Sequence, residues 1–122
     1  MSSPQEIKLR PIGTVHRKEE VQVIELYPEY ADGLLRIEEA NRLQILFWMH
    51  RLTVDQRTTL TAHPHGDTSN RLRGVFALRS PMRPNPIGST VVRLQEVEDH
   101  QLRVRGLDAE DGSPVIDIKI VD

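Results

Sequence analysis

Two segments near the C-terminus alternate apolar with charged residues, and this period of two constrains the fold more than any other feature. Gln101–Leu107 sets apolar residues against arginines, and Val115–Val121 sets three isoleucines against Asp117 and Lys119. Such alternation is typical of strands that bury one face. Asp111-Gly112 between them is a turn signal, so we expect a hairpin with a longer loop.

Other segments rich in apolar or β-branched residues are also predicted to be strands. One short helix is predicted over Leu34–Ala40, with Asp32 as its N-cap. Many short strands with a single helix indicate a mostly β fold, a largely antiparallel barrel. The further predicted strands are Lys8–His16, Val21–Tyr27, Arg42–Leu52, Thr58–Ala62, Leu72–Leu78 and Thr90–Val97.

The apolar block in Arg42–Leu52 suits either a buried helix or a buried strand, because periodicity cannot separate the two. Its aromatic residues and its alternation favour a strand. One face of that strand would carry Leu43, Ile45, Phe47 and Met49.

Length and composition fit one domain, 1–122. The absence of cysteine excludes disulfides, cysteine zinc sites and thiol nucleophiles. The longest apolar run, Ile45–Met49, is too short to cross a membrane, and Met1–Arg10 lacks the apolar region of a secretory signal. We therefore expect a cytoplasmic protein with no membrane partner.

His63 and His65, in a polar loop over His63–Asn70, lack further ligands at a suitable spacing, so no metal site is predicted.

Charge is unevenly distributed along the chain, although the net charge is only −2. The stretch from Arg71 to Arg93 holds five arginines and no acid, whereas eight acids and three bases follow from Glu96 onward. One stretch suits an anionic ligand and the other a cationic one. Ordinary surface charge that happens to segregate in sequence explains the pattern equally well.

Arg79–Gly88 is the most unusual stretch, with three prolines within six residues. Proline fixes φ, so this loop is stiff and loses little entropy when it holds a ligand. Arg79, Arg83 and Asn85 offer planar donors for carboxylates, phosphates or base edges. The alternative is a rigid connection with solvated arginines.

A second polar stretch, Gly106–Pro114, clusters the carboxylates of Asp108, Glu110 and Asp111. Such a cluster suits a ribose diol, an ammonium group or a metal ion. Taken by itself, the stretch is better explained as a polar hairpin loop.

These stretches together resemble one family. Arg73–Gly88, which reads RGVFALRSPMRPNPIG, closely resembles the TrmO (TsaA-like) signature RGVFATRSPxRPNPIG. Asp111–Lys119, which reads DGSPVIDIK, is similar to the family element DGTPVxDIK. Pro11-Ile12-Gly13 and Ile45–His50 fit the first strand and the apolar strand ending in histidine. The resemblance covers nearly the whole chain, in order and at matching spacing.

The resemblance implies a single-sheeted β-barrel that forms a homodimer and binds S-adenosylmethionine. It also implies methyl transfer to N6 of N6-threonylcarbamoyladenosine, the hypermodified base beside the tRNA anticodon. The cofactor-binding residues that it implies are Arg17, Lys18, Glu19, His50, Arg51, Arg79, Ser89, Asp108, Ala109, Glu110 and Asp111.

For the substrate, Arg83, Asn85 and Lys119 are the candidate binding residues, because a threonyl carboxylate suits Arg83 or Lys119. Asp117 is the candidate general base for the acceptor nitrogen. A purely orienting role for Asp117 is equally open.

Three features depart from the family pattern. Arg17-Lys18-Glu19 stands where the family has Ser-Pro-Tyr, and Ile120-Val121 stands where it has Pro-Tyr. The sequence also ends at Asp122, without the C-terminal domain of bacterial members. The second and third departures motivate an alternative hypothesis, a non-catalytic module that binds S-adenosylmethionine or a related nucleoside as a sensor or partner-binding domain.

Overall fold

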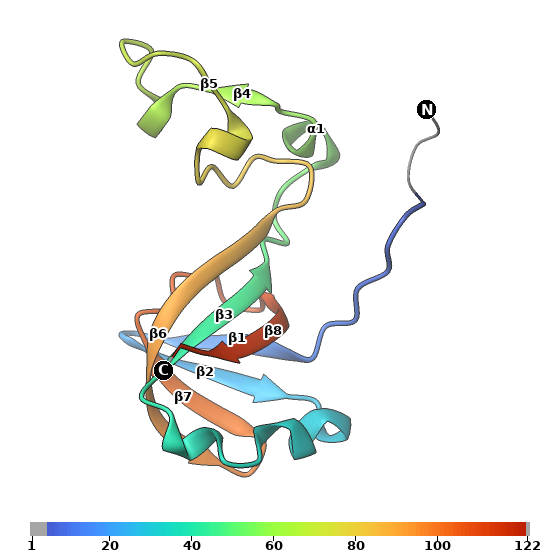
Figure 1. Ribbon diagram of the computed structural model, residues 1–122, viewed down its shortest axis with the longest axis vertical. Helices are drawn as coiled ribbons and strands as arrows, with labels where there is room; N and C mark the ends of the chain where they lie inside the picture. Colours follow the sequence, from blue (N-terminus) through green and yellow to red (C-terminus); the bar gives the residue numbers. More distant parts are fainter. Residues whose placement is uncertain (1–4, 122) are drawn as a thin grey trace.

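Six strands form a closed antiparallel barrel in the computed structural model, which describes residues 5–121. Around the barrel the strand order is β1-β2-β7-β6-β3-β8, and β8 pairs with β1 to close it (Figure 1). The prediction of a mostly β, largely antiparallel barrel is confirmed. The strands are β1 (Gly13–Lys18), β2 (Val21–Leu26), β3 (Arg42–Trp48), β6 (Ile87–Glu98), β7 (Gln101–Arg105) and β8 (Pro114–Ile120).

Alternating side chains of these strands fill the barrel. In β3, Leu43, Ile45 and Phe47 are buried and the residues between them are less so, as the period of two predicted. Each such side chain contributes about 1.5–3 kcal/mol when it leaves water, so the barrel interior is the main source of stability. The other strands add Val15, Ile24, Leu26, Val92, Leu102, Val104 and Val115 to this core.

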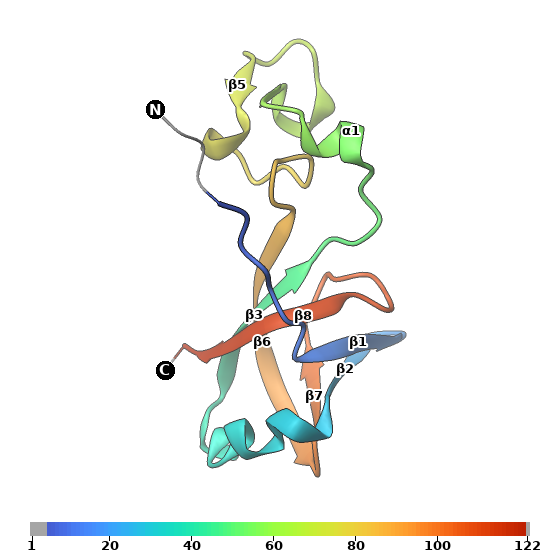
Figure 2. The same ribbon diagram turned by 90° about the vertical axis from the view of Figure 1, so that its right-hand side faces the viewer.

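Residues 49–86 leave the barrel as an arm that projects from one end (Figures 1 and 2). Only Val75 and Pro86 are buried among residues 49–86, all of which the structure describes. The arm therefore has almost no core of its own. It contains the helix α1 (Val54–Arg57), the paired strands β4 (Thr61–Ala62) and β5 (Arg73–Gly74), and the 3-10 helices η3 (Pro64–Gly66) and η4 (Val75–Ala77).

The predicted helix over Leu34–Ala40 is wrong. Two 3-10 helices, η1 (Pro28–Leu34) and η2 (Ile37–Glu39), occupy this region. Arg36 between them has a left-handed φ of 70°, which interrupts any continuous helix.

The predicted N-cap, Asp32, lies inside η1, because Pro28 begins that helix with the φ that proline fixes. Leu34 and Ile37 pack against the barrel core. This region covers the end of the barrel opposite the arm (Figure 2).

The predicted strands in the arm are largely wrong. Thr58–Ala62 contributes only the two residues of β4, and Leu72–Leu78 forms the two residues of β5 followed by η4. The residues between them turn too often to pair over a longer stretch. The helix α1 was not predicted, although Thr53 and Gln56 form a capping box whose spacing is visible in the sequence.

Strand ends in the barrel also differ from the predictions. The first strand begins at Gly13 rather than Lys8, because Pro11 has no N–H to donate and only Ile12 N–H, among residues 5–12, donates to β8. β3 ends at Trp48, before the predicted Leu52, and β6 begins at Ile87, before the predicted Thr90.

No helix within residues 5–121 is both long and apolar enough to span a membrane.

Candidate functional site

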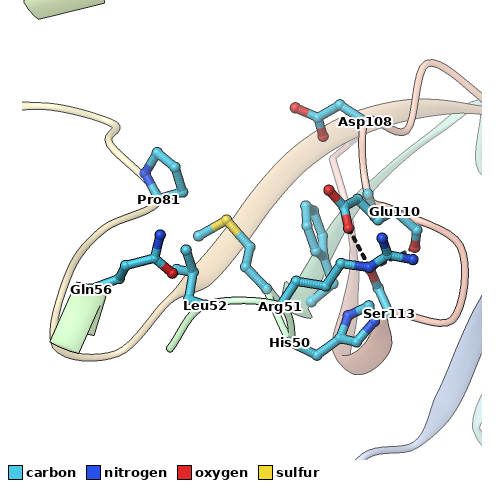
Figure 3. Close-up of a pocket in the computed structure, with 11 residues that line it drawn as sticks. His50, Arg51, Leu52, Gln56, Pro81, Asp108, Glu110 and Ser113 are labelled. Carbon is cyan, nitrogen blue, oxygen red and sulfur yellow. Dashed lines mark hydrogen bonds and ion pairs between the residues drawn. The ribbon is translucent and has the colours of Figure 1, made fainter. Parts of the chain in front are cut away.

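Two adjoining cavities lie where the arm leaves the barrel. The first, of about 300 Å³, is bounded by the end of β3, by α1 and by the loop between β7 and β8 (Figure 3). The second, of about 250 Å³, is bounded by residues 78–83 and by the start of β6. Phe47, Met49 and Asp108 line both cavities, so the two are compartments of one site. Together they have a size usual for small-molecule sites, about 300–1,000 Å³.

Charged groups gather on one side of the first cavity, opposite Gln56 and Pro81 of the arm (Figure 3). Arg51 Nε lies 2.8 Å from Oε2 of Glu110. The two side chains are 69% and 62% exposed, so their ion pair contributes little to stability. The pair is therefore available for exchange with a ligand. His50 lies beside it, and Phe47, Met49 and Leu52 supply the apolar surface.

The loop that carries Asp108–Glu110 is fixed by bonds from the barrel. Leu107 N–H donates to Oε1 of the buried Gln22 at 3.1 Å. Arg17 Nη1 donates to the carbonyl oxygens of Leu107 and Ala109 at 2.5 and 2.8 Å, and the Arg17 amide donates to Oδ1 of Asp111 at 2.9 Å. Arg17 and Asp111 thus shape the loop from behind and do not line either cavity.

The second cavity brings the arginine-rich segment to β6. Arg79 Nη2 donates to the Ser89 carbonyl oxygen at 3.1 Å, and Thr90 Oγ1 donates to Oδ1 of Asp108 at 2.5 Å. Gly88 lies against the Phe47 ring, and a Cβ there would be 2.3–2.7 Å from ring carbons. The close contact between this glycine and Phe47 fixes the junction of barrel and arm.

Two arginines bind main-chain carbonyls of the arm. Arg83 donates through Nε to Ser80 O at 2.7 Å, and through Nη2 to Val75 O and Leu78 O at 2.5 and 2.6 Å. Arg57 donates through Nε to Pro84 O at 3.0 Å, and its guanidinium lies 5.1 Å from the centre of the Trp48 ring. Such charge-assisted bonds order a segment that has little apolar burial.

Most of the predicted cofactor-binding residues come together. His50, Arg51 and Asp108–Glu110 line the first cavity, and Arg79, Ser89 and Asp108 line the second. Arg83 also lines the second cavity, but its guanidinium donates to main-chain carbonyls of the arm.

Five predicted residues lie outside both cavities in addition to Arg17 and Asp111. Lys18 is the last residue of β1, Glu19 belongs to the turn between β1 and β2, and Asn85 is exposed in the arm. Asp117 and Lys119 lie on β8, where Asp117 Oδ1 accepts the Ile118 amide and Oδ2 is 3.6 Å from Lys119 Nζ.

The sequence reasoning missed several residues of the site. Thr90 orients Asp108, and Gln56, Leu52 and Pro81 line the first cavity. The capping-box spacing would have located Gln56, and Pro81 belongs to the family motif itself. Nothing in the sequence marks Leu52. Among residues 5–121, no three His, Asp or Glu side chains are arranged to hold a metal ion.

Taken together, the site offers carboxylates for ammonium groups or hydroxyls, guanidiniums for a carboxylate, and apolar surface from Phe47 and Met49. It therefore suits a zwitterionic ligand with an apolar portion.

Comparison with known proteins agrees with the sequence resemblance. A family model described as tRNA-methyltransferase O N-terminal domain matches residues 2–121. A protein of Archaeoglobus fulgidus named S-adenosyl-L-methionine-binding protein is 52% identical over 99 residues, which cover 81% of this chain and 68% of that protein. A protein of Methanocaldococcus jannaschii named probable S-adenosyl-L-methionine-binding protein is 39% identical over 113 residues, which cover 92% of this chain and 90% of that one.

A crystal structure of TrmO from Pseudomonas aeruginosa matches with a TM-score of 0.74 at 27% identity. The match covers 97% of this chain and 57% of that one, so the chain spans less than two thirds of that structure. From the near-complete family match and these relatives, we conclude that the chain belongs to the tRNA-methyltransferase O N-terminal domain family.

Proposed function

We propose that this protein is a cytoplasmic S-adenosylmethionine-dependent methyltransferase that modifies N6 of N6-threonylcarbamoyladenosine beside the anticodon of tRNA. The observation that carries the proposal is the convergence of four distant segments on the two cavities. These segments contribute His50-Arg51, Arg79, Ser89 and Asp108–Glu110. Family membership and the names of the relatives support it.

The residues of the two cavities fit this cofactor. The carboxylates of Asp108 and Glu110 suit its ammonium group and ribose hydroxyls, and the guanidinium of Arg79 suits its carboxylate. Phe47 and Met49 suit the apolar faces of its adenine and its thioether carbons. When bound, the cofactor supplies a methyl group carried on positively charged sulfur.

The chain's own contribution is to hold charges in place. Thr90 fixes Asp108 at the junction of the cavities, so that carboxylate needs no reorientation during the reaction. Much of the acceleration in such a transfer comes from alignment of the reacting atoms. Asp117 lies outside both cavities, and its carboxylate contacts the Ile118 amide and Lys119 of its own strand. We therefore assign it the role of orienting these β8 groups rather than the role of general base.

Mass spectrometry of nucleosides tests the activity. Protein, cofactor and tRNA that carries the threonylcarbamoyl base should yield that base with one added methyl group, whereas tRNA lacking the modification should yield none. Absence of product on the modified tRNA would contradict the enzyme.

The alternative, a non-catalytic binding module, is supported by the names of the two archaeal relatives, which mention binding alone. Calorimetry with S-adenosylmethionine separates the two hypotheses when it is run beside the turnover assay. Micromolar binding without turnover would identify the module, and absence of binding would exclude both.

Arg79→Lys tests the cofactor site. Lysine keeps the charge but loses the planar pair of donors that matches a carboxylate, so we expect about tenfold weaker binding, roughly 1–2 kcal/mol. Arg71→Lys is the matched control, because Arg71 is an exposed arm residue that lines neither cavity. Equal affinity of both variants for the cofactor would remove Arg79 from the site.

We also propose that the working unit is a homodimer with the arginine-rich segment near the subunit boundary. Exposed apolar side chains of the arm support this: Leu60, Leu72 and the 81% exposed Phe76. The two joined cavities have the size of a site for one small molecule, and a pocket shared between subunits would supply the further space that a base needs. Light scattering should report twice the mass of 14.0 kDa. An active monomer would disprove the shared pocket.

A further inference from the structure

The loop between β7 and β8 that walls the first cavity carries main-chain N–H groups without partners. Within residues 5–121, none of the amides of Asp108–Asp111 donates a hydrogen bond. The amides on either side are bonded to the barrel: that of Leu107 donates to Gln22 Oε1, and that of Gly112 donates to Val15 O. A backbone N–H without a partner in the protein bonds water or a ligand. The amides of Asp108–Asp111 are therefore open to a ligand.

Arg17 sets the direction in which two of these amides point. One nitrogen of its guanidinium, Nη1, donates to the carbonyl oxygens of Leu107 and Ala109 at 2.5 and 2.8 Å. No peptide bond within residues 5–121 is cis, so the N–H of each peptide unit points away from its C=O. The N–H groups of Asp108 and Glu110 therefore point away from Arg17. Because Asp108 and Glu110 line the first cavity and Arg17 does not, this is the side of the cavity.

Each of these two residues offers an acceptor beside its N–H donor. Asp108 and Glu110 lie on one stretch of the loop (Figure 3). Thr90 donates to Oδ1 of Asp108, and Arg51 lies 2.8 Å from Oε2 of Glu110. A carboxylate has about four acceptor sites, so both keep capacity for a ligand. A hydroxyl both donates and accepts, so two such residues suit a pair of neighbouring hydroxyls.

The ribose of S-adenosylmethionine carries such a pair and joins the adenine to the methionine portion. Arg79, proposed for the carboxylate of the methionine portion, lines the second cavity and not the first. Leu52 adds apolar surface to the first cavity and not to the second. Asp108 lines both cavities, so a ribose beside it leaves the adenine and the methionine portion each in its own cavity.

We infer that Arg17 is a positioning residue of the proposed cofactor site. By holding two carbonyls, it turns the N–H groups of Asp108 and Glu110 into the first cavity. There the two amides donate to the ribose hydroxyls, and the carboxylates of the same residues accept from them. Arg17 stands where the family pattern has serine, so this role belongs to this chain. The inference rests on the proposed function and adds to it how the loop is oriented.

The loop stays attached to the barrel when the Arg17 side chain is removed. The main-chain amide of Arg17 still donates to Oδ1 of Asp111 at 2.9 Å. Val15 still exchanges bonds with the far end of the loop, since its amide donates to Ser113 O and its carbonyl accepts from the Gly112 amide. Substitution of Arg17 therefore releases two carbonyls without detaching the loop.

Arg17→Ala tests the inference. We expect affinity for S-adenosylmethionine, measured by calorimetry, to fall about tenfold while the midpoint of thermal unfolding stays close to that of the unmodified protein. Millimolar methylguanidinium, which can occupy the place of the missing group, should restore much of the affinity. Arg105→Ala is the matched control, because Arg105 is an exposed arginine paired with Glu20, and it should change neither affinity nor response. Unchanged affinity of Arg17→Ala, or loss without rescue, would overturn the positioning role.

Deoxy analogues of the cofactor test the recognised group. The unmodified protein should bind the 2′-deoxy and 3′-deoxy forms of S-adenosylmethionine about tenfold more weakly than the parent. Arg17→Ala should discriminate much less, because its amides are no longer held toward the hydroxyls. Equal binding of all three forms by the unmodified protein would overturn the inference.

Amide NMR supplies a readout independent of turnover. The proton resonances of the Asp108 and Glu110 amides should shift downfield when S-adenosylmethionine is added, and this shift should be absent in Arg17→Ala. If the unmodified protein binds no cofactor, the proposed function fails. If it binds the cofactor and these two resonances stay in place, this inference alone fails.

Discussion

The barrel and the arm are stabilised by different interactions. In the barrel, Val15, Ile24 and Ile45 are fully buried and every strand pairs on both sides. In the arm, main-chain carbonyls bound by Arg57 and Arg83 replace an apolar core. Segments with few buried apolar contacts open locally at low free energy. The barrel can therefore keep the cofactor loop in place while the arm adjusts around ligands.

Removal of a buried side chain from the barrel should lower the free energy of unfolding more than any other change, and truncation of a side chain in the arm should not have this effect. Ile45→Ala deletes methyl groups from a fully buried position, and we expect the free energy of unfolding to fall by about 2–5 kcal/mol. Leu72→Ala, at a 58% exposed position in the arm, should change it by less than about 0.5 kcal/mol. Urea unfolding of both variants checks this, and equal losses would show that the arm shares the core's role.

The junction of the two regions should be the next most sensitive. Gly88→Ala forces Cβ into the ring of the buried Phe47, and overpacking of this kind costs about 1–3 kcal/mol. Thermal unfolding measures the loss. If the clash is the cause, adding Phe47→Leu to Gly88→Ala should restore part of the lost stability. No restoration would point to strain in the backbone instead.

Arg83→Ala should separate the regions most clearly. Three carbonyls lose their donor, so amide hydrogen exchange should accelerate in residues 75–83 while the strands keep their protection. Affinity for S-adenosylmethionine should fall about tenfold, the factor given by roughly 1.4 kcal/mol, because the arm walls the second cavity. Arg71→Ala, also in the arm, is the control. Faster exchange throughout the barrel would mean that the two regions unfold together.

The smallest effect concerns the charge of one loop in the arm. The hydroxyl and then the amide of Ser69 donate to Asp67 and lower the pKa of that carboxyl below 3.8. Since the folded pKa is lowered, this stabilisation is complete above pH 3.8 and is lost as the pH falls through the folded pKa.

Ser69→Ala should therefore raise the pKa of Asp67 toward 3.8, as a carboxyl NMR titration would report. Glu25 on the barrel is an internal reference, because bonds from Gln101 and His16 lower its pKa independently of the arm. An unchanged pKa of Asp67 would assign the whole effect to the Ser69 amide.

The sequence was most informative where the structure depends on local patterns. The period of two in β3 and the turn at Asp111-Gly112 are local, and the structure contains both. In β8 the predicted alternation is wrong, because a register shift opposite Leu46 and Phe47 interrupts it and Ile120 is 66% exposed. The family resemblance implied Arg79 and Asp108 as cofactor-binding residues, and both line the cavities. Predictions failed over Leu34–Ala40 and Leu72–Leu78, because Arg36 and the tight turns of the arm interrupt segments whose composition suggests continuity.

By itself, the sequence determined that the chain forms an antiparallel barrel and that one of its loops is stiff and bears arginines, because alternation and proline act on neighbouring residues. Only the tertiary structure decided what those arginines do. Arg83 is turned to three carbonyls, and Arg17, 94 positions from Asp111, shapes the acidic loop from behind. Such roles depend on strand register and loop contact, which join residues far apart in the chain and leave no local pattern to read.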